Sequence, residues 1–227
     1  MRGRFALRAW RARLDEHVAE RYQQALFDED IVVIPAQSLV RYVPHPGLHR
    51  GDFDRDALID ECQPMRRRNA EQDESVIQLV SVFIVRHQNR YLTYKRTRRL
   101  PESRLHGFYS IAFGGHLNPN DITPLFNVFE SDSPFLTREL HEELRVKDSD
   151  IQSLQYRGLL YDDSRPVSRQ HLGVTYDVCL NTDRYQIGER GFLMDAKFET
   201  LEEISARLQQ FENWSILLVE EERLCHR

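Results

Sequence analysis

Hydrophobic and polar residues alternate in short runs along the larger, second part of the chain, and turn residues separate these runs. Such alternation is typical of strands in a sheet. We expect strands at 76–85, 91–96, 108–113, 154–161, 172–180 and 192–198, and helices at 201–211 and from residue 213 onward. A turn at His87-Gln88-Asn89 separates the first two strands. This order of elements predicts an α/β fold, a three-layer α/β/α sandwich around a mixed sheet.

The first 73 residues have a different pattern. Leu7, Trp10, Leu14, Val18 and Tyr22 repeat at helical spacing and predict a docked amphipathic helix. Arginines among the first 13 residues leave an organellar targeting segment as the alternative, although acidic residues follow soon after. A strand-like run at 31–34 and a helix at 54–62 come next. We therefore divide the chain into an N-terminal helical extension, 1–73, and an α/β domain, 74–227.

A short acidic helix stands out in the middle of the α/β domain. Ser133 and Pro134 suit the N-cap and the first helical position, which predicts a helix from Pro134 to about Arg145. At 100° per residue, one face carries an apolar stripe and a neighbouring narrow sector carries three carboxylates. The stripe is Leu136, Leu140 and Leu144, and the carboxylates are Glu139, Glu142 and Glu143.

Three carboxylates this close repel one another, and helix propensity does not explain their arrangement. A hard, oxygen-seeking ion such as Mg²⁺ or Mn²⁺ would compensate their charge. The alternative is an ordinary solvated acidic face. Ahead of the helix, the 108–113 strand runs into Gly114-Gly115, where the backbone is free to turn a carbonyl toward a cation.

The run Arg138-Glu139-Leu140-His141-Glu142-Glu143, preceded by Gly114-Gly115-His116, resembles the Nudix box, Gly-x5-Glu-x7-Arg-Glu-U-x-Glu-Glu-x-Gly-U. Val146 also matches. Two positions depart from the pattern: the stretch from Gly115 to Arg138 is nine residues longer, and Arg145 stands where the pattern has Gly. Glu130 stands the expected eight positions before Arg138.

The resemblance implies a Nudix-type sandwich that cleaves a phosphoanhydride, the diphosphate bond of a nucleotide or nucleotide-derived metabolite, with Mg²⁺ or Mn²⁺. It implies that the Gly114 carbonyl, Glu139, Glu142 and Glu143 hold the metal. By the same resemblance Glu139 orients or deprotonates the attacking water, and Arg138 holds the glutamates in place.

The resemblance extends over roughly the last two thirds of the chain. Its closing elements are Phe198-Glu-Thr-Leu-Glu-Glu-Ile204 and Phe211-Glu-Asn-Trp-Ser215. Its opening is similar to a smaller branch of MutT-type phosphoesterases, through Gln78, Tyr94-Lys95-Arg96, Glu102-Ser-Arg104-Leu105 and Gly114-Gly115-His116. Membership of this branch would not name a substrate.

Several residues outside the box are further candidates. Among the basic residues Lys95, Arg96, Arg98, Arg99 and Arg104, we choose Lys95 and Arg104 as phosphate ligands, with a solvated basic loop as the alternative. His116 is a candidate phosphate ligand or proton shuttle, or else it bonds the backbone of the inserted loop. Glu189 is the candidate further catalytic carboxylate, with Asp162 and Asp163 as competitors. Tyr161, Tyr176 and Phe126 are candidates for base stacking or for core packing.

Composition narrows the functional classes. The 227 residues include 31 basic and 36 acidic ones, a net charge of −5 that argues against a dedicated nucleic-acid binder. Cys62, Cys179 and Cys225 lack metal-ligand spacing and indicate a reducing cytoplasm. No apolar run reaches the length of a membrane span, so no membrane partner is expected. The Nudix resemblance implies a small nucleotide-type molecule as the partner. The N-terminal extension is a candidate homodimer interface. A nucleotide sensor without catalysis and an interaction protein remain the competing classes.

Overall fold

The computed structural model describes residues 27–51, 53–97, 106–122, 128–129, 134–188 and 193–225. One mixed sheet forms its centre, with the strand order β10-β5-β4-β9-β8-β2. These strands are β2 (Gly47–His49), β4 (Val76–His87), β5 (Arg90–Arg96), β8 (Ile151–Tyr161), β9 (His171–Leu180) and β10 (Leu193–Thr200). The pair β4 and β9 is parallel, and the other neighbours on this path are antiparallel.

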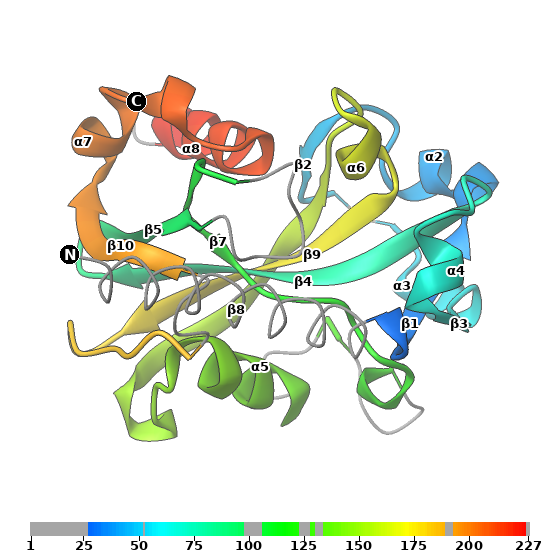
Figure 1. The fold of residues 1–227 in the computed structure, drawn as a ribbon, viewed down its shortest axis with the longest axis horizontal. Helices are drawn as coiled ribbons and strands as arrows, with labels where there is room; N and C mark the ends of the chain where they lie inside the picture. Colours follow the sequence, from blue (N-terminus) through cyan, green and yellow to red (C-terminus); the bar gives the residue numbers. More distant parts are fainter. Residues whose placement is uncertain are drawn as a thin grey trace, which may run out of the picture.

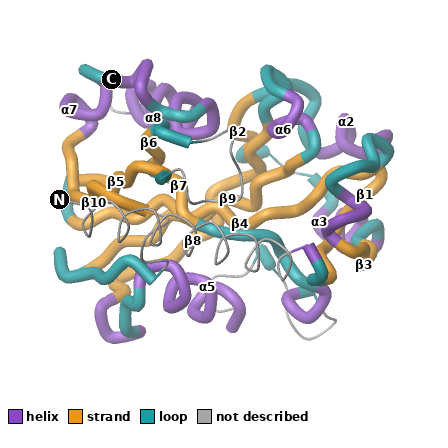
Figure 2. Tube along the Cα trace, in the orientation of Figure 1, coloured by secondary structure: helices purple, strands orange, loops and turns teal. Residues whose placement is uncertain are grey.

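Helices cover both faces of the sheet, as Figures 1 and 2 show. On one face α5 (Pro134–Leu144) packs Leu136, Leu140 and Leu144 into the larger apolar core. On the other face α7 (Leu201–Ser205) and α8 (Asn213–Cys225) pack into a second core through residues such as Ile204 and Leu218. The short α6 (Pro166–Arg169) leads into β9. The expected α/β/α sandwich with a mixed sheet is confirmed.

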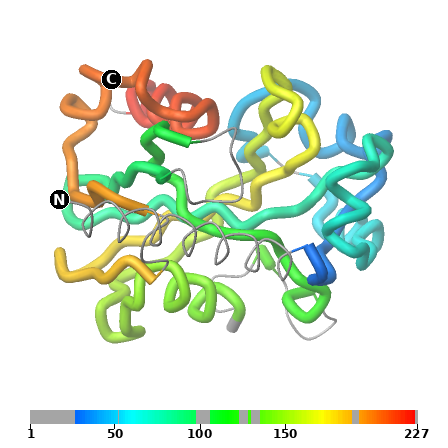
Figure 3. The backbone as a smooth tube through the Cα atoms, viewed as in Figure 1, coloured from blue at the N-terminus to red at the C-terminus, as the bar shows by residue number. Residues whose placement is uncertain are grey.

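Residues 27–73 contribute strands to the same sheet. β1 (Asp30–Pro35) pairs with β3 (Gln63–Arg66) and with β4, while β2 pairs with β8. Short helices α2 (Leu39–Tyr42), α3 (Arg55–Asp60) and α4 (Arg67–Ala70) lie between or after these strands. In Figure 3 this segment, coloured blue to light blue, lies toward the right of the view, where β1 pairs with the first residues of β4. The expected amphipathic helix before it lies outside the described residues, and the division at residue 73 stays a prediction.

Two expected elements are wrong in detail. The single strand at 108–113 is two short strands, β6 (Tyr109–Ser110) on β5 and β7 (Ala112–Phe113) on β4. Between β6 and β7 the chain moves from pairing with β5 to pairing with β4, because side chains accept the hydrogen bonds that a neighbouring strand would otherwise accept. Ser215 Oγ accepts from Ile111 N, and Ser110 Oγ accepts from Ala112 N. The helix at 201–211 ends at Ser205, and a 3₁₀ turn follows at Leu208–Gln210.

Three further 3₁₀ turns complete the described elements, at Ala36–Ser38, Pro119–Asp121 and Asp148–Asp150. The three cysteines are free thiols. Burial raises the pKa of the Cys62 thiol to about 12, and its Sγ donates to the Leu58 carbonyl at 3.3 Å, so this thiol is unreactive. Within the described ranges, no helix has both the length and the apolar character needed to cross a bilayer.

Candidate active site

The acidic face of α5 opens onto a cavity of about 390 Å³. Leu136, Leu140 and Leu144 are fully buried beneath the helix, which fixes its rotation. The three carboxylates share the sector next to this stripe, and Glu139, Glu142 and Glu143 all line the cavity. A volume of this size lies in the range of ordinary small-molecule sites.

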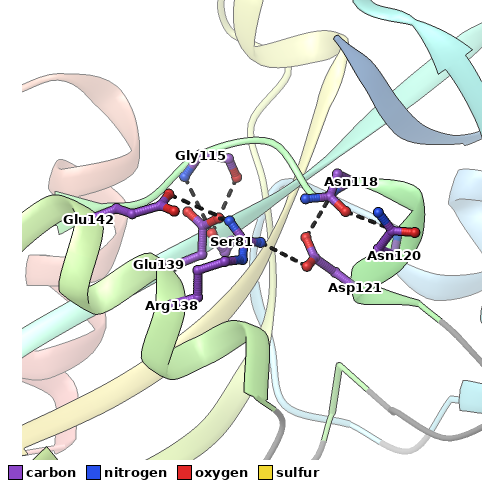
Figure 4. Close-up of polar contacts among 8 residues, drawn as sticks. All are labelled: Ser81, Gly115, Asn118, Asn120, Asp121, Arg138, Glu139 and Glu142. Atoms are coloured by element: carbon purple, nitrogen blue, oxygen red, sulfur yellow. Dashed lines mark hydrogen bonds and ion pairs between the residues drawn. The ribbon is translucent and has the colours of Figure 1, made fainter.

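Arg138 connects two parts of the site, as Figure 4 shows. Its Nη1 lies 2.7 Å from Glu139 Oε1, and its Nη2 lies 2.7 Å from Asp121 Oδ1. Glu142 Oε2 lies at 3.5 Å from the same Nη1. Asp121 is itself fixed, because its Oδ2 accepts from Asn118 N at 2.9 Å. Asp121 thus fixes one nitrogen of the Arg138 guanidinium, and the other nitrogen orients the Glu139 carboxylate.

The Glu139 carboxyl has a strongly raised pKa. Its pKa is raised from 4.5 to about 7, chiefly because burial disfavours its charged form; Arg138 opposes this effect, and Glu142 and Asp121 add to it. A raised pKa marks a carboxylate whose charge the protein alone leaves undercompensated. Together with Glu142 and Glu143 it forms an all-oxygen donor set, which fits Mg²⁺ or Mn²⁺.

The glycine turn lies directly against the sheet. Gly114 has φ +138°, and a Cβ there would stand 2.0 Å from the Ser81 carbonyl oxygen, so only glycine fits. Ser81 then holds the next residue: its N donates to the Gly115 carbonyl at 2.8 Å, and its Oγ accepts from Gly115 N at 3.3 Å. A Cβ on Gly115 would lie 3.6 Å from Glu139 Oε2, so the turn passes close to the carboxylate.

The residue that replaces the box glycine adopts the conformation a glycine would have. Arg145 follows the last residue of α5 with φ +48°, the left-handed region typical of a helix C-terminus. Two backbone amides from a later loop cap the helix: Gln186 N donates to the Leu144 carbonyl, and Gly188 N donates to the Glu143 carbonyl at 2.7 Å. Arg145, in place of the glycine of the pattern, therefore does not change where α5 ends.

Several predicted residues lie away from the cavity. Lys95 packs over the Tyr109 ring, with its Nζ 5.1 Å from the centroid, and is not among the cavity residues. Asp162 is buried in a turn, where it accepts from Ser164 N and Oγ. Tyr176 is fully buried and stacks on Phe83 at 5.4 Å, so it belongs to the core. Asp163 and Tyr161 do not line the cavity either.

The remaining predicted residues lie outside the described part of the chain. They are Arg104, Glu130, Glu189, Phe126, Arg98, Arg99 and Ser133.

His116 does line the cavity, but in a role that the sequence did not indicate. Its Nε2 contacts Gln78 Oε1 at 2.9 Å, and its ring lies 5.4 Å from that of His171. Burial, Arg67 and His171 lower its pKa well below 6.5. The imidazole is therefore neutral near pH 7, which does not suit the proposed proton shuttle.

Sequence reasoning assigned no role to three residues of the site. Arg165 and Trp214 line the cavity from segments far from α5 in the sequence, and Asp121 anchors Arg138 across 17 positions of sequence. Arg96, at the end of β5, also lines the cavity; it was among the basic candidates but was not one of the two chosen. Asp121 had a local signal, the Asn-Pro-Asn-Asp turn of residues 118–121, but this composition predicts a turn and not a partner.

Known proteins share this architecture. The sequence matches no protein-family model. Protein YmaB of Bacillus subtilis is 29% identical over 156 residues, which cover 65% of this chain and 73% of YmaB. The crystal structure of Tm1382, described as a candidate Nudix hydrolase, aligns with a TM-score of 0.65 and 24% identity, over 85% of this chain and 97% of that one. DR0079 from Deinococcus radiodurans aligns with a TM-score of 0.51 and 15% identity, over 88% of this chain and all of that one.

Proposed function

From this chain's Nudix fold, shared with Tm1382, we propose that it is a divalent-metal-dependent hydrolase of a phosphoanhydride bond in a small nucleotide or nucleotide-derived molecule. One observation carries the proposal: Glu139, Glu142 and Glu143 all line a single cavity of about 390 Å³, which the Gly114-Gly115 turn also lines. A sensor module would not need all three carboxylates on the cavity wall.

The cavity has the charges that a diphosphate requires. Glutamates of α5 line it, and so do Arg96, at the end of β5, and Arg165, just before α6. Arginine can bind phosphate oxygens through paired N–H donors. Trp214 adds an aromatic surface to the wall, suited to the base of a nucleotide.

The residues of the site divide the chemistry among them. Glu139, Glu142, Glu143 and the Gly114 carbonyl would hold Mg²⁺ or Mn²⁺. When bound, such a cation neutralises charge on the phosphate oxygens and lowers the pKa of a bound water. Glu139 accepts the proton of the attacking water. Arg138, held by Asp121, keeps that carboxylate aimed at the cavity.

A substrate panel tests the proposal. Metal-free protein is incubated with Mg²⁺ or Mn²⁺ and with nucleoside triphosphates, nucleotide sugars, ADP-ribose, dinucleoside polyphosphates and dinucleotide cofactors. Release of phosphate, pyrophosphate and mononucleotide is measured. We expect metal-dependent turnover of at least one compound, and its loss in Glu142→Gln and Glu143→Gln. The matched control is Glu220→Gln, an exposed carboxylate on α8 outside the cavity, which should retain turnover.

Two results would contradict the hydrolase. Metal-dependent binding of a panel member without product release would indicate a sensor. Turnover that persists in both box variants would place the chemistry elsewhere in the molecule.

A further inference from the structure

A second group of potential ligands lines the same cavity, apart from the carboxylates of α5. Glu71 follows α4, His116 follows the glycine turn, and His171 begins β9. One ligand atom from each lies within 4.8 Å of the other two, and all three residues line the cavity. Ligand atoms around a tetrahedral Zn²⁺ are about 3.4 Å apart for bonds of about 2.1 Å. Side-chain shifts of about 1 Å would therefore bring these three atoms to coordination distance.

Hydrogen bonds orient both imidazoles. His171 Nδ1 lies 2.6 Å from the Val167 carbonyl oxygen, which only accepts, so Nδ1 carries the hydrogen and Nε2 carries the lone pair in the neutral ring. His116 Nε2 donates in the same way to Gln78 Oε1 at 2.9 Å, which leaves the lone pair on Nδ1. Metal-binding histidines characteristically donate their second N–H to a carbonyl or carboxylate that fixes the ring. Each ring here has such a partner.

Two carboxylates offset the positive charge beside the imidazoles. Arg67 lowers the pKa of His116 and so opposes a cation there. Its Nη1 pairs with Glu29 Oε1 at 2.8 Å, and its Nε lies 3.7 Å from Glu71 Oε1, so its guanidinium faces two carboxylates. Three protein ligands would occupy three corners of a tetrahedron and leave the fourth to the cavity, as in zinc sites that bind water or substrate.

We propose that Glu71, His116 and His171 form a second cation site, selective for a borderline ion such as Zn²⁺ over Mg²⁺, at the cavity wall away from α5. Imidazole nitrogens suit Zn²⁺, whereas Mg²⁺ prefers oxygen ligands and keeps its waters. The site does not depend on the hydrolase function, because it is defined by binding and not by turnover.

Metal binding to the full-length protein tests this site. Metal-stripped protein, with excess Mg²⁺ present to fill the oxygen site, is titrated with Zn²⁺ against a chromophoric chelator and with Co²⁺, whose visible bands report four-coordinate geometry. We expect one equivalent of Zn²⁺. The affinity should fall by at least about tenfold in His171→Ala and in Glu71→Gln, and by about tenfold or more in Gln78→Leu, which removes the hydrogen-bond partner of His116.

Controls separate this site from others. The rings of His45, which is exposed, and His49, which is half-buried, lie 4.5 Å apart. The double variant His45→Ala with His49→Ala therefore tests adventitious binding to another histidine pair and should leave the affinity unchanged. Thermal melting shows that each variant is folded, and His171→Gln replaces His171→Ala if the latter is not. The proposal is overturned if wild type takes up no Zn²⁺ under excess Mg²⁺, if the ligand variants bind like wild type, or if the double variant of His45 and His49 abolishes binding.

Discussion

Replacing Glu139 by glutamine should stabilise the metal-free protein at alkaline pH. The Glu139 carboxyl has a pKa of about 7 when folded against 4.5 for an ordinary glutamate, because burial disfavours its charge. Folding therefore favours the protonated form, so stability is complete below about pH 4.5 and falls as the pH rises toward 7. A shift of about 2.5 pH units at 1.36 kcal/mol each amounts to about 3 kcal/mol at pH 8. Glutamine, which resembles the protonated acid, should remove this cost.

Urea denaturation in the presence of a chelator measures the effect. We expect Glu139→Gln to exceed wild type by about 3 kcal/mol at pH 8 and by less than about 1 kcal/mol at pH 5, with a slope near 1.4 kcal/mol per pH unit between the two pKa values. For a chain of this length, about 3 kcal/mol corresponds to about 6–12 °C in Tm. Loss of turnover in the same variant would show that stability and catalysis conflict at this residue.

A neighbouring glutamate provides the control. The Glu142 side chain is 60% exposed, and Glu142→Gln should change stability by less than about 0.5 kcal/mol at either pH. The reasoning is refuted if Glu139→Gln is less stable than wild type at pH 8, or if its effect is the same at pH 5 and pH 8.

Three further substitutions test other parts of the site. Gly114→Ala should lower the free energy of unfolding, measured by urea denaturation, by more than about 3 kcal/mol or prevent folding, because its Cβ would overlap the Ser81 carbonyl. The control Gly107→Ala, at φ +80° with nothing within 4 Å of the added Cβ, should lower it by only about 1 kcal/mol. Equal losses in the two variants would contradict the overlap. Arg145→Gly should stabilise by about 0.5–1 kcal/mol, since relief of left-handed backbone exceeds the added chain entropy; a loss of stability would contradict this. Asp121→Asn should lower kcat about tenfold or more and displace the pH profile of kcat, because it weakens the ion pair that positions Arg138. An unchanged kcat would show that Asp121 does not contribute to the site.

Features encoded by local spacing were predictable. The leucine stripe of α5 predicts which side of the helix is buried, and the structure has Leu136, Leu140 and Leu144 fully buried. The alternating runs predict the long strands, with β4 extending two residues beyond the expected 85 to His87. These patterns arise from side-chain periodicity within one element, which a single sequence displays.

Features that depend on distant partners were not predictable. The strand at 108–113 divides because Ser215, 104 residues from Ile111, supplies a bond that a neighbouring strand would otherwise make. Asp121 reaches Arg138 only because a 3₁₀ turn places it beside α5. The association of Glu71 with His171 joins segments a hundred positions apart. No local pattern specifies such contacts, since tertiary packing alone brings the residues together.

The origin of the oxygen atom in the product tests the central claim most directly. The compound that turns over fastest in the panel is hydrolysed in ¹⁸O-labelled water with Mg²⁺ or Mn²⁺, and the products are analysed by mass spectrometry. We expect one labelled oxygen in one of the two phosphoryl products, formed only when the divalent ion is present and Glu139 is intact. Label in a non-phosphoryl product, labelled product formed equally without metal, or no hydrolysis of any panel compound would contradict the account.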